Sequence, residues 1–471
     1  MRQSYILSFA KGVAVNAPSE DRIVIEMPVT YKQLALNRLS SGLRQSIEIL
    51  ASTGATEEAL ADMVAEKDGP DALAKLYYHL MFFVEYRIIS YSITFNGQRL
   101  AILSPNSVFF SFSPASIDPQ SNYVLSRFAY LHREQGEMVM ESPLSHGKIV
   151  LHGREAAAIA SELAKAQTLA ALCDTLPHLP PDTVLLFLEM LVGAGFVCEV
   201  KDGKTCPEES EALVQWDFHD LLFHTRSRLG RHAHPYGATY RFHCKIEPLP
   251  VIKPAITENA IPLYRPDMDA LRQEDHPFTL VLEERKSIRE YAKEPITERQ
   301  IGEFLYRTAR VKQMLRSEYQ DVSMRPYPGS GAIYELELYL TVQACRGISS
   351  GFYHYCPERH VLEKIGGLTE AAVSLLKDAR WATGMEETPQ ILITIAARFQ
   401  RLSWKYESMA YSALLKNVGV LYQNMYLVAT AMDLAPCALG GGDSDLFARA
   451  AGLDYYRETS VGEFLIGSKR I

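Results

Sequence analysis

The stretch RPYPGSGAIYELELYL, at residues 325–340, carries the pattern that decides how the second half of this sequence folds. It opens with a Pro-Gly-Ser-Gly turn, Pro328 to Gly331, and runs into an apolar segment from Leu336 to Val342. Glycine has no Cβ and accepts positive φ, so such a turn lets the backbone approach another group closely. The alternation in the apolar segment predicts a core strand. Taken alone, the turn is either a tight loop or one wall of a ligand site.

Two further motifs, one on each side of this turn, favour the ligand site. Upstream, RKSIR occupies residues 285–289, and an extended backbone would place Arg285, Ser287 and Arg289 on one side. Two guanidinium groups and a hydroxyl suit a phosphate monoester, which arginine binds in bidentate fashion. A solvated charged loop is the alternative. Downstream, ALGGGD at residues 438–443 is a second close-approach loop. Together the three motifs predict a site for one flat, phosphorylated cofactor.

Composition narrows the class of protein. Of the 471 residues, 47% are hydrophobic and 22% are charged, which is typical of a soluble globular protein with two to four domains. The net charge of −8 argues against nucleic acid as a main partner, because binding to phosphates needs a basic face. We expect no membrane partner, since the most apolar segment, Val184 to Val200, is interrupted by Glu189 and predicts a buried helix followed by a strand. Seven scattered cysteines without zinc-site spacing, and no evident signal peptide, predict a cytoplasmic protein with reduced thiols.

Residues 1–115 predict a winged-helix-like module. After two strand-like runs, helices are expected around Leu43–Leu50, after the N-cap Thr56, and after Gly69-Pro70, and an Asn96-Gly97 hairpin turn then closes a wing. The same order recurs with a period on the order of 110 residues, so residues 116–215 predict a second module, whose wing turns at residues 202–203. The helix before each wing is not rich in Arg or Lys, which argues against DNA. Two hypotheses remain: a peptide clamp that adds a ligand strand to a sheet edge, or an architectural brace.

Residues 216–268 predict a linker, and residues 269–471 predict a second kind of domain. The run from Trp216 to His234 is rich in His and Arg, but the spacing of His219 and His224 does not place them on one helical face, so we predict polar contacts to the next domain and no metal. The Pro-rich segment 247–266 predicts the domain boundary. From there on helices and strands alternate, which predicts an α+β domain with a mixed sheet between helices.

The ordered motifs resemble those of the nitroreductase-like flavoproteins. To RKSIR and PGSGA the sequence adds GFYHY at residues 351–355, which is similar to the Gly-aromatic-Tyr pattern of that family. Within the family the chain most resembles the azoline dehydrogenases of ribosomal-peptide clusters, the McbC-like and SagB-type enzymes. The cyanobactin oxidases, with two clamp-like domains ahead of the flavin domain, are the most similar in architecture. The resemblance in motifs covers only the part of the chain after residue 284.

The resemblance implies FMN, bound at a homodimer interface so that each site draws on both chains. The contacts that it implies are Arg285, Lys286, Ser287 and Arg289 for the phosphate; Pro328, Gly329, Ser330 and Gly331 for the isoalloxazine edge; and Leu439, Gly440, Gly441 and Gly442 for the loop facing flavin N5. Glycine suits that last loop, because a side chain would block hydride transfer. Lys469 and Arg470 could reach the same phosphate, although a charged chain end is the simpler explanation.

The dipeptide Lys405-Tyr406 resembles the Lys-Tyr pair at the active site of the azoline dehydrogenases. Oxidising a thiazoline to a thiazole removes a proton from Cα and a hydride from Cβ. The resemblance therefore implies Lys405 as the base, because desolvation helps a lysine to lose its proton, and Tyr406 as a group that shares or relays that proton. An ordinary surface dipeptide is the alternative.

These expectations combine into one function and two alternatives. We expect an FMN-dependent oxidase that converts thiazolines, with oxazolines as a second candidate, of a heterocyclised precursor peptide into azoles in cyanobactin-type biosynthesis. Molecular oxygen would reoxidise the flavin. One alternative is an NAD(P)H-dependent nitro or flavin reductase of the same fold, although the longer polar Asn/Arg pattern of classical nitroreductases is missing. The other is a non-catalytic peptide-docking scaffold.

Overall fold

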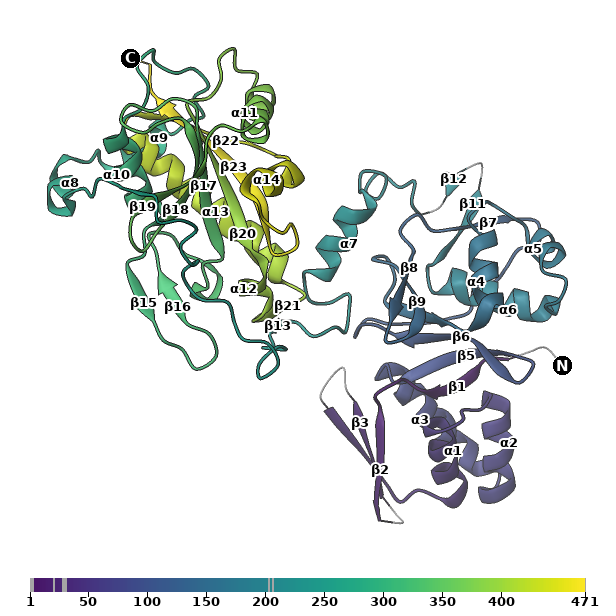
Figure 1. Ribbon diagram of the computed structural model, residues 1–471. Helices are drawn as coiled ribbons and strands as arrows, with labels where there is room; N and C mark the ends of the chain where they lie inside the picture. The colour runs from purple at the N-terminus through teal and green to yellow at the C-terminus, as the bar shows by residue number, and fades with distance from the viewer. Residues whose placement is uncertain (1–3, 20–21, 28–31, 202–203, 206, 471) are drawn as a thin grey trace. The chain divides into compact units, whose positions relative to one another are not determined.

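The chain forms two compact units, residues Met1–His234 and Pro235–Ile471, each with its own core (Figure 1). The computed structural model describes residues 4–19, 22–27, 32–201, 204–205 and 207–470. The division between the units falls inside the segment 216–268, which the sequence predicts to be a linker. The division into four parts stays a prediction. No helix in the described ranges is both long and apolar enough to cross a membrane.

The first half of unit 1 follows the predicted order of helices and wing. Its elements are β1 (Ile6–Phe9), β2 (Ala14–Ser19), β3 (Arg22–Met27), β4 (Lys32–Asn37), α1 (Ser41–Ala51), α2 (Glu57–Asp68), the 3-10 turn η1 (Pro70–Ala72), α3 (Leu73–Glu85), β5 (Ile89–Phe95) and β6 (Gln98–Pro105). Thr56 caps α2, because its hydroxyl oxygen accepts the Ala59 N–H at 3.2 Å. Asn96 and Gly97 both have positive φ in the β5–β6 turn, as a tight hairpin of this kind requires. The predicted cap and wing are confirmed.

The second half of unit 1 repeats this order. Its elements are β7 (Asn122–Leu125), β8 (Tyr130–Glu134), β9 (Glu137–Glu141), β10 (Gly147–Leu151), α4 (Gly153–Glu162), α5 (Leu169–Thr175), α6 (Pro181–Gly193), β11 (Val197–Lys201) and β12 (Lys204–Thr205), followed by α7 (Phe218–Arg226). Thr168 caps α5 as Thr56 caps α2. The backbone bridge from Leu7 to Ala55 recurs between Tyr123 and Gln167. The internal repeat is therefore confirmed, and the wing turn at residues 202–203 lies outside the described residues.

The two copies differ in how their three-stranded meanders pair. In the second copy, β8, β9 and β10 extend the sheet of the first copy, because β10 pairs with β6 to give the order β1-β5-β6-β10-β9-β8. In the first copy, β2, β3 and β4 form a separate sheet, and β4 pairs with β3 alone among the described strands. The first wing thus joins the two copies into one unit, and among the described strands β4 is paired on one side whereas the corresponding β10 is paired on both.

Unit 2 contains a seven-stranded sheet in the order β14-β19-β18-β17-β20-β23-β22. Its strands and helices are β13 (Gly237–Ala238), β14 (Ala260–Pro262), α8 (Met268–Glu274), α9 (Phe278–Glu284), α10 (Glu298–Ala309), β15 (Gln313–Leu315), β16 (Val322–Met324), η2 (Ser330–Ala332), β17 (Leu336–Val342), β18 (Gly351–Cys356), β19 (Val361–Gly366), α11 (Glu370–Thr383), β20 (Ile391–Arg398), α12 (Phe399–Ser403), β21 (Tyr406–Glu407), α13 (Ala410–Ala431), β22 (Leu434–Ala438), α14 (Ser444–Ala451) and β23 (Glu458–Ser468). The α+β class is confirmed. The prediction of a mixed sheet is wrong, because every pair in it is antiparallel: hairpins join β17, β18 and β19, and each helical crossover brings its next strand beside an oppositely directed neighbour.

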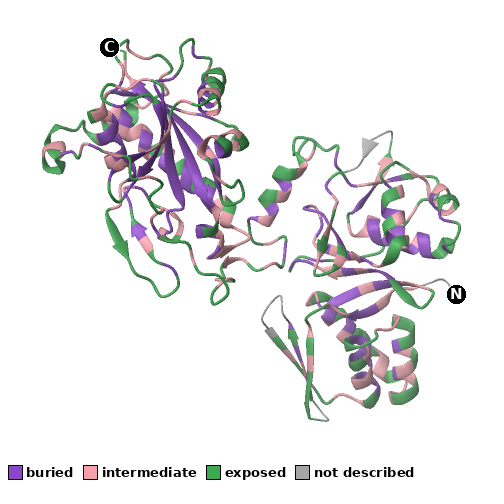
Figure 2. Cartoon of the chain, in the orientation of Figure 1, coloured by how far each residue is buried: buried purple, intermediate pink, exposed green. Residues whose placement is uncertain are grey.

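The predicted strand at residues 336–342 is the centre of this unit. Every residue of β17 is buried, and Figure 2 shows the buried residues concentrated in the central strands. Leu338 and Leu340 belong to the core that α10 and α13 cover, whereas Tyr339 belongs to the core formed with α11 and α14. The sheet therefore lies between two layers of helices, as predicted, and its fully buried strands need apolar residues on both faces.

Candidate functional site

The Pro-Gly-Ser-Gly turn and the Lys405-Tyr406 dipeptide lie beside each other in unit 2. A Cβ placed on Gly331 would lie 2.5 Å from the Tyr406 hydroxyl oxygen and 2.7 Å from Lys405 Nζ. Gly331 also has a φ of 58°, in the left-handed region that glycine tolerates best. Space and backbone conformation therefore both call for glycine here. The polar ends of Lys405 and Tyr406 converge on the backbone of the turn.

Asn417, 5% exposed on α13, holds this turn in place. Its Oδ1 accepts hydrogen bonds from the Ser330 N–H at 3.0 Å and from the Ser330 hydroxyl at 2.9 Å. Its Nδ2 donates to Glu335 Oε1 at 2.8 Å. Glu335 is fully buried, which raises the pKa of its carboxyl, and its Oε2 has no hydrogen-bond partner in the described part of the chain. Sequence reasoning missed Asn417, whose one signal is an amide within an apolar helix.

The run predicted to bind a phosphate packs against the C-terminal half of α13. The Ser287 hydroxyl lies 2.7 Å from the Tyr426 hydroxyl, and the Arg285 guanidinium lies 5.3 Å from the centre of the same ring. Burial raises the pKa of the Cys437 thiol, and the nearby Arg289 and Ser287 oppose that rise. The three alternating residues thus gather around Tyr426 and Cys437, neither of which the motif analysis singled out.

The loop from Leu439 to Gly442 leaves β22 next to these residues. The Leu439 N–H donates to the Glu463 carbonyl oxygen at 2.9 Å. Gly440 and Gly441 are exposed, and a Cβ on either would meet nothing within 4 Å. A Cβ on Gly442 would collide with the Glu463 carboxylate, which is 8% exposed and whose pKa burial raises. A side chain at position 442 would therefore displace the Glu463 carboxylate, and the backbone at positions 440 and 441 is open.

One helix carries contacts to all three motifs. Asn417 contacts the glycine turn through Ser330, and Tyr426 contacts the phosphate run through Ser287. The Tyr426 hydroxyl also accepts the Ala438 N–H at 2.8 Å, just before the triple-glycine loop. Asn417 and Tyr426 are nine residues apart on α13, or about 14 Å at 1.5 Å per residue. All three motifs are therefore anchored to α13, although a spacing of nine residues, or two and a half turns, directs Asn417 and Tyr426 to opposite sides of the helix.

The basic residues near the chain end lie beside the phosphate run, but their side chains pair with acids. Tyr291 and Lys469 form a backbone bridge. Lys469 Nζ lies 2.8 Å from Asp433 Oδ1, and Arg470 Nη1 lies 3.5 Å from Glu290 Oε2. A role for either residue in binding a phosphate stays a prediction. The remaining predicted contacts are partly or fully exposed: Lys286, Pro328 and Gly329.

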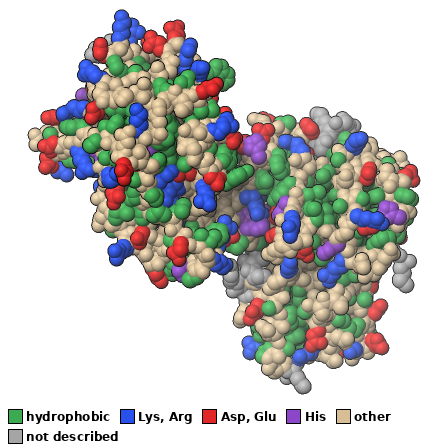
Figure 3. Space-filling view, in the orientation of Figure 1, with side chains coloured by type: hydrophobic (Ala, Val, Ile, Leu, Met, Phe, Trp, Pro, Cys, Tyr) green, Lys and Arg blue, Asp and Glu red, His purple; other side chains and the backbone are tan. Residues whose placement is uncertain are grey.

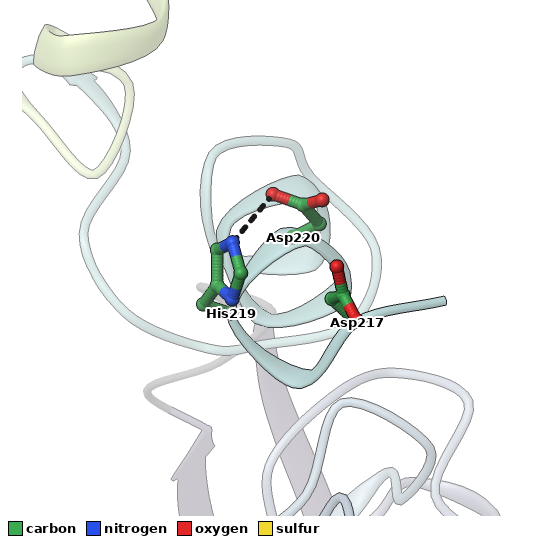
Figure 4. Close-up of side chains that lie close together, drawn as sticks. All are labelled: Asp217, His219 and Asp220. Carbon is green, nitrogen blue, oxygen red and sulfur yellow. Dashed lines mark ion pairs between the residues drawn. The ribbon is translucent and has the colours of Figure 1, made fainter. Parts of the chain in front are cut away.

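The His/Arg-rich segment belongs to unit 1 and contains α7, which was not predicted. At its start, the ligand atoms of Asp217, His219 and Asp220 lie within 4.8 Å of one another, and His219 Nε2 is 3.2 Å from Asp220 Oδ1 (Figure 4). The prediction from the sequence considered the spacing of His219 and His224 only, and it missed these two carboxylates. All three side chains are exposed. Because exposed clusters of acidic groups are common without a bound ion, we assign no metal to them.

At its other end the same segment contacts a buried carboxylate. Glu141, 2% exposed on β9, accepts a hydrogen bond from the Tyr130 hydroxyl at 2.7 Å, and Arg226 and His234 lie 3.4 and 3.6 Å away. Burial alone would raise the pKa of Glu141, but the nearby His234, the hydrogen bond from Tyr130 and the charge of Arg226 hold it well below its usual range. Figure 3 shows basic and histidine side chains gathered on the visible face of unit 1. In these contacts the segment packs against unit 1, to which it belongs.

Comparison with known proteins places unit 2 in a family. "Putative nitroreductase MJ1384" of Methanocaldococcus jannaschii is 31% identical over 180 residues, which are 37% of this chain and 81% of that protein. The chain belongs to the nitroreductase family. The model of the Nitroreductase family matches residues 282–468, the model described as "ThcOx helix turn helix domain" matches residues 1–113, and that described as "Cyanobactin oxidase ThcOx" matches residues 123–233. This nitroreductase-family chain is therefore an oxidoreductase, and its N-terminal part matches the models of the cyanobactin oxidase and of its helix-turn-helix domain.

Two further similarities concern microcin processing. The nitroreductase-family chain is 28% identical over 141 residues to the microcin B17-processing protein McbC of Escherichia coli, covering 28% of this chain and 49% of McbC, so that it spans about half the length of that relative. A chain of the E. coli microcin synthetase McbBCD complex with truncated pro-MccB17 bound matches with 19% identity and a TM-score of 0.34, over 53% of this chain and 91% of that one. A TM-score below 0.5 supports no argument about function.

Proposed function

We propose that this protein is an FMN-dependent oxidase that converts thiazolines or oxazolines of a precursor peptide into azoles, with molecular oxygen as the final electron acceptor. The observation that carries the proposal is the convergence of Lys405 Nζ and the Tyr406 hydroxyl on Gly331. The cyanobactin oxidase models and the similarity to McbC favour the same chemistry over reduction of nitro-compounds.

The residues along α13 fit FMN. At one end, Arg285 and Ser287 contact Tyr426, which leaves a guanidinium and a hydroxyl at the place where a phosphate would bind. Beside Tyr426, the loop that contains Gly440 and Gly441 leaves backbone open to a flat ring, since a Cβ there would meet no atom within 4 Å. When bound, FMN supplies the hydride acceptor that azoline oxidation needs.

Lys405 and Tyr406 would carry the proton step. Lys405 Nζ lies 5.3 Å from the centre of the Tyr406 ring, and the polar ends of both side chains approach Gly331 so closely that a Cβ there would clash with them. Loss of a hydride from Cβ produces a stable double bond only if the Cα proton also leaves, and a positioned base makes that step faster. We assign the base to Lys405 and the sharing or relay of its proton to Tyr406.

A second copy of the chain is the partner that we propose for an apolar surface on α9 and α13. On α13, Tyr411 is 48% exposed and Leu415, one turn later, is 41% exposed. On α9, Phe278 is 66% exposed, and α9 ends directly before Arg285. An interface between copies would therefore adjoin the phosphate run, which supports a cofactor site shared by two chains.

We propose that the first copy of the repeat in unit 1 binds the precursor peptide. Its β4 has an open outer edge, whereas the corresponding β10 is flanked on both sides by β9 and β6. Its α3 exposes Tyr78 at 58% and Met81 at 62%, whereas α6, the corresponding helix, is buried along most of its length. An extended peptide could add to β4 by main-chain hydrogen bonds and place apolar side chains on α3.

The absorbance spectrum of the purified protein tests the cofactor. The full chain should purify yellow with FMN, and replacing both Arg285 and Arg289 with Ala should remove it, because the phosphate then loses both of its guanidinium partners. A control that replaces the exposed Arg272 and Arg457 with Ala should stay yellow. Retention of FMN by the Arg285→Ala, Arg289→Ala variant would contradict the assignment of the phosphate.

Turnover of a thiazoline-containing peptide tests the chemistry. Lys405→Ala should keep the flavin but lose azole formation by on the order of a hundredfold, the contribution expected of a general base. Tyr406→Phe should cause a smaller loss if the tyrosine only relays the proton. Near-normal turnover in both variants would place the base elsewhere. Rapid bleaching of the flavin by NADPH, without azole formation, would favour the reductase instead.

A further inference from the structure

The segment 235–253, which we name the strap, packs on the catalytic dipeptide. Its strand β13 pairs antiparallel with β21, so that Gly237 lies opposite Glu407 and Ala238 lies opposite Tyr406. Two residues later, the Tyr240 N–H donates a hydrogen bond to the Lys405 carbonyl oxygen at 3.2 Å. The backbone of Lys405-Tyr406 is therefore held by the strap.

Side chains extend this attachment on both sides of the dipeptide. The Thr239 hydroxyl donates to Glu407 Oε2 at 3.0 Å, and the Trp404 indole N–H donates to the Ile246 carbonyl oxygen at 2.7 Å. The Ser408 hydroxyl donates a hydrogen bond to the Pro235 carbonyl oxygen at 2.8 Å. Residues 404–408 thus contact the strap in an unbroken run.

Buried arginines fix the far end of the strap. Arg401 is fully buried, and it donates to the carbonyl oxygens of Leu249 at 2.6 Å and of Ile333, just after the glycine turn, at 2.8 Å. Burial lowers the pKa of Arg401 to about 10. Arg398 donates to the Pro250 carbonyl oxygen at 2.8 Å. Charge-assisted hydrogen bonds of this kind hold the strap and the glycine turn to the same helix, α12, and its neighbouring strand.

The Tyr240 ring lies beside the side chain of Lys405. Lys405 Nζ is 5.8 Å from the centre of the Tyr240 ring and 5.3 Å from that of Tyr406, so that two aromatic rings flank it. Tyr240 has a φ of 51°, which is rare for an aromatic residue. Its ring is held there by Tyr319, at 4.5 Å between centroids, and by Trp404, at 6.1 Å. A side chain kept in an unfavourable backbone conformation by several contacts points to a specific role.

We propose that Tyr240 is a positioning residue for the azoline oxidation, and that the strap is a wall of the active site instead of a linker. The Tyr240 ring packs beside the lysine side chain, limits its rotamers and directs Nζ toward Gly331, where the substrate proton would leave. The inference rests on the proposed function for its effect on turnover. The placement of Lys405 itself can be tested without that function.

Turnover by the FMN-loaded full chain is the first test. Tyr240→Asn removes the ring but accepts the positive φ, whereas Tyr240→Phe keeps the ring. With a thiazoline-containing peptide, Tyr240→Asn should lower kcat by on the order of tenfold or more while KM and flavin content change little, because the base is misplaced and binding is not. Tyr240→Phe should restore most of kcat. The exposed Tyr456→Asn is the control and should match the unmodified protein. Unchanged kcat in Tyr240→Asn, or an equal loss in Tyr240→Phe, would overturn the proposal.

Chemical labelling of lysine separates this inference from the proposed function. In limited reaction with an amine-acylating reagent, followed by mass spectrometry, Tyr240→Asn should speed labelling of Lys405 several-fold and Tyr240→Phe should not. Labelling of the exposed Lys416 should be the same in all three proteins. Equal labelling of Lys405 in all of them would refute the positioning role, even if azoline oxidation is observed. Altered labelling without azoline oxidation would refute the proposed function alone.

Discussion

Replacing Asn417 with Leu should destabilise unit 2 and loosen the glycine turn. The substitution removes three hydrogen bonds: two from Ser330 and one to Glu335. A typical hydrogen bond contributes about 1 kcal/mol to stability, so the two bonds to Ser330 account for about 2 kcal/mol. The bond to Glu335 weighs more, because this carboxyl is 0% exposed and its Oε2 already has no partner in the described residues. Leaving a second buried oxygen without a partner costs about 1–3 kcal/mol.

The sum is a loss of about 3–5 kcal/mol, less about 0.5 kcal/mol because leucine favours a helix more than asparagine does. Asn424→Leu is the matched control, since Asn424 lies on the same helix and donates one hydrogen bond, to the Thr308 carbonyl oxygen at 2.9 Å. It should cost only about 1 kcal/mol with the same gain in helix propensity. Urea unfolding of the two variants, with FMN content measured alongside, gives the comparison. Equal losses of stability, or full FMN retention by Asn417→Leu, would refute the role assigned to this network.

Three further predictions follow from the same geometry. Among buried ionised groups, hydrogen bonds to Glu337 and Glu363 raise the pKa of His354 although burial opposes them, so its contribution to stability is present below pH 6.5 and is lost as the pH rises through its folded pKa. Burial would raise the pKa of Glu337, but the hydrogen bond to His354 and nearby positive charge lower it to about 2. Roughly 3 kcal/mol of stability should therefore be lost as the pH falls from 4.5 toward 2. Urea unfolding measured against pH should show a loss of stability on the acid side and on the basic side, and Glu337→Gln should remove the loss on the acid side. Gly331→Ala should cost about 1–3 kcal/mol through its positive φ and displace Lys405 or Tyr406, which melting temperature and turnover would detect; a variant with unchanged turnover would count against the site. Leu415→Glu should convert a homodimer into a monomer in light scattering, and a persisting dimer would place the interface elsewhere.

Local signals in the sequence predicted individual elements well. The apolar run at residues 336–342 is β17 without a shift. Thr56 caps α2, and the Asn96-Gly97 turn closes the first wing. Each of these elements depends on residues that are close together in the sequence, so the sequence alone shows why it forms.

Long-range pairing left no such trace. Nothing local in β10 shows that it pairs with β6, and nothing in residues 237–238 shows that they pair with residues 406–407. The same reason explains the wrong prediction of a mixed sheet, since strand direction depends on which neighbour each crossover meets. In the site, the glycine and arginine motifs were recognisable because several residues share a pattern. Asn417 and Tyr426 are single polar groups on an apolar helix, and their importance depends on partners far away in the sequence.

Backbone strain in unit 2 gathers where these motifs meet. Tyr240, Ala332, Tyr334 and Ser408 all have positive φ, and they lie next to Gly331 in the chain, next to the lysine–tyrosine pair, or in the strap that bonds to it. Each such residue costs on the order of 1–3 kcal/mol, so it persists only where surrounding contacts fix it. The described contacts fix these residues: the strap pairs with β21, Arg401 donates a hydrogen bond to the Ile333 carbonyl oxygen after the turn, and Asn417 accepts one from Ser330 within it. Contacts within the folded chain therefore fix the geometry of the proposed site, and the proposed oxidation would benefit from this, because fixed polar groups need not reorganise as a reaction proceeds.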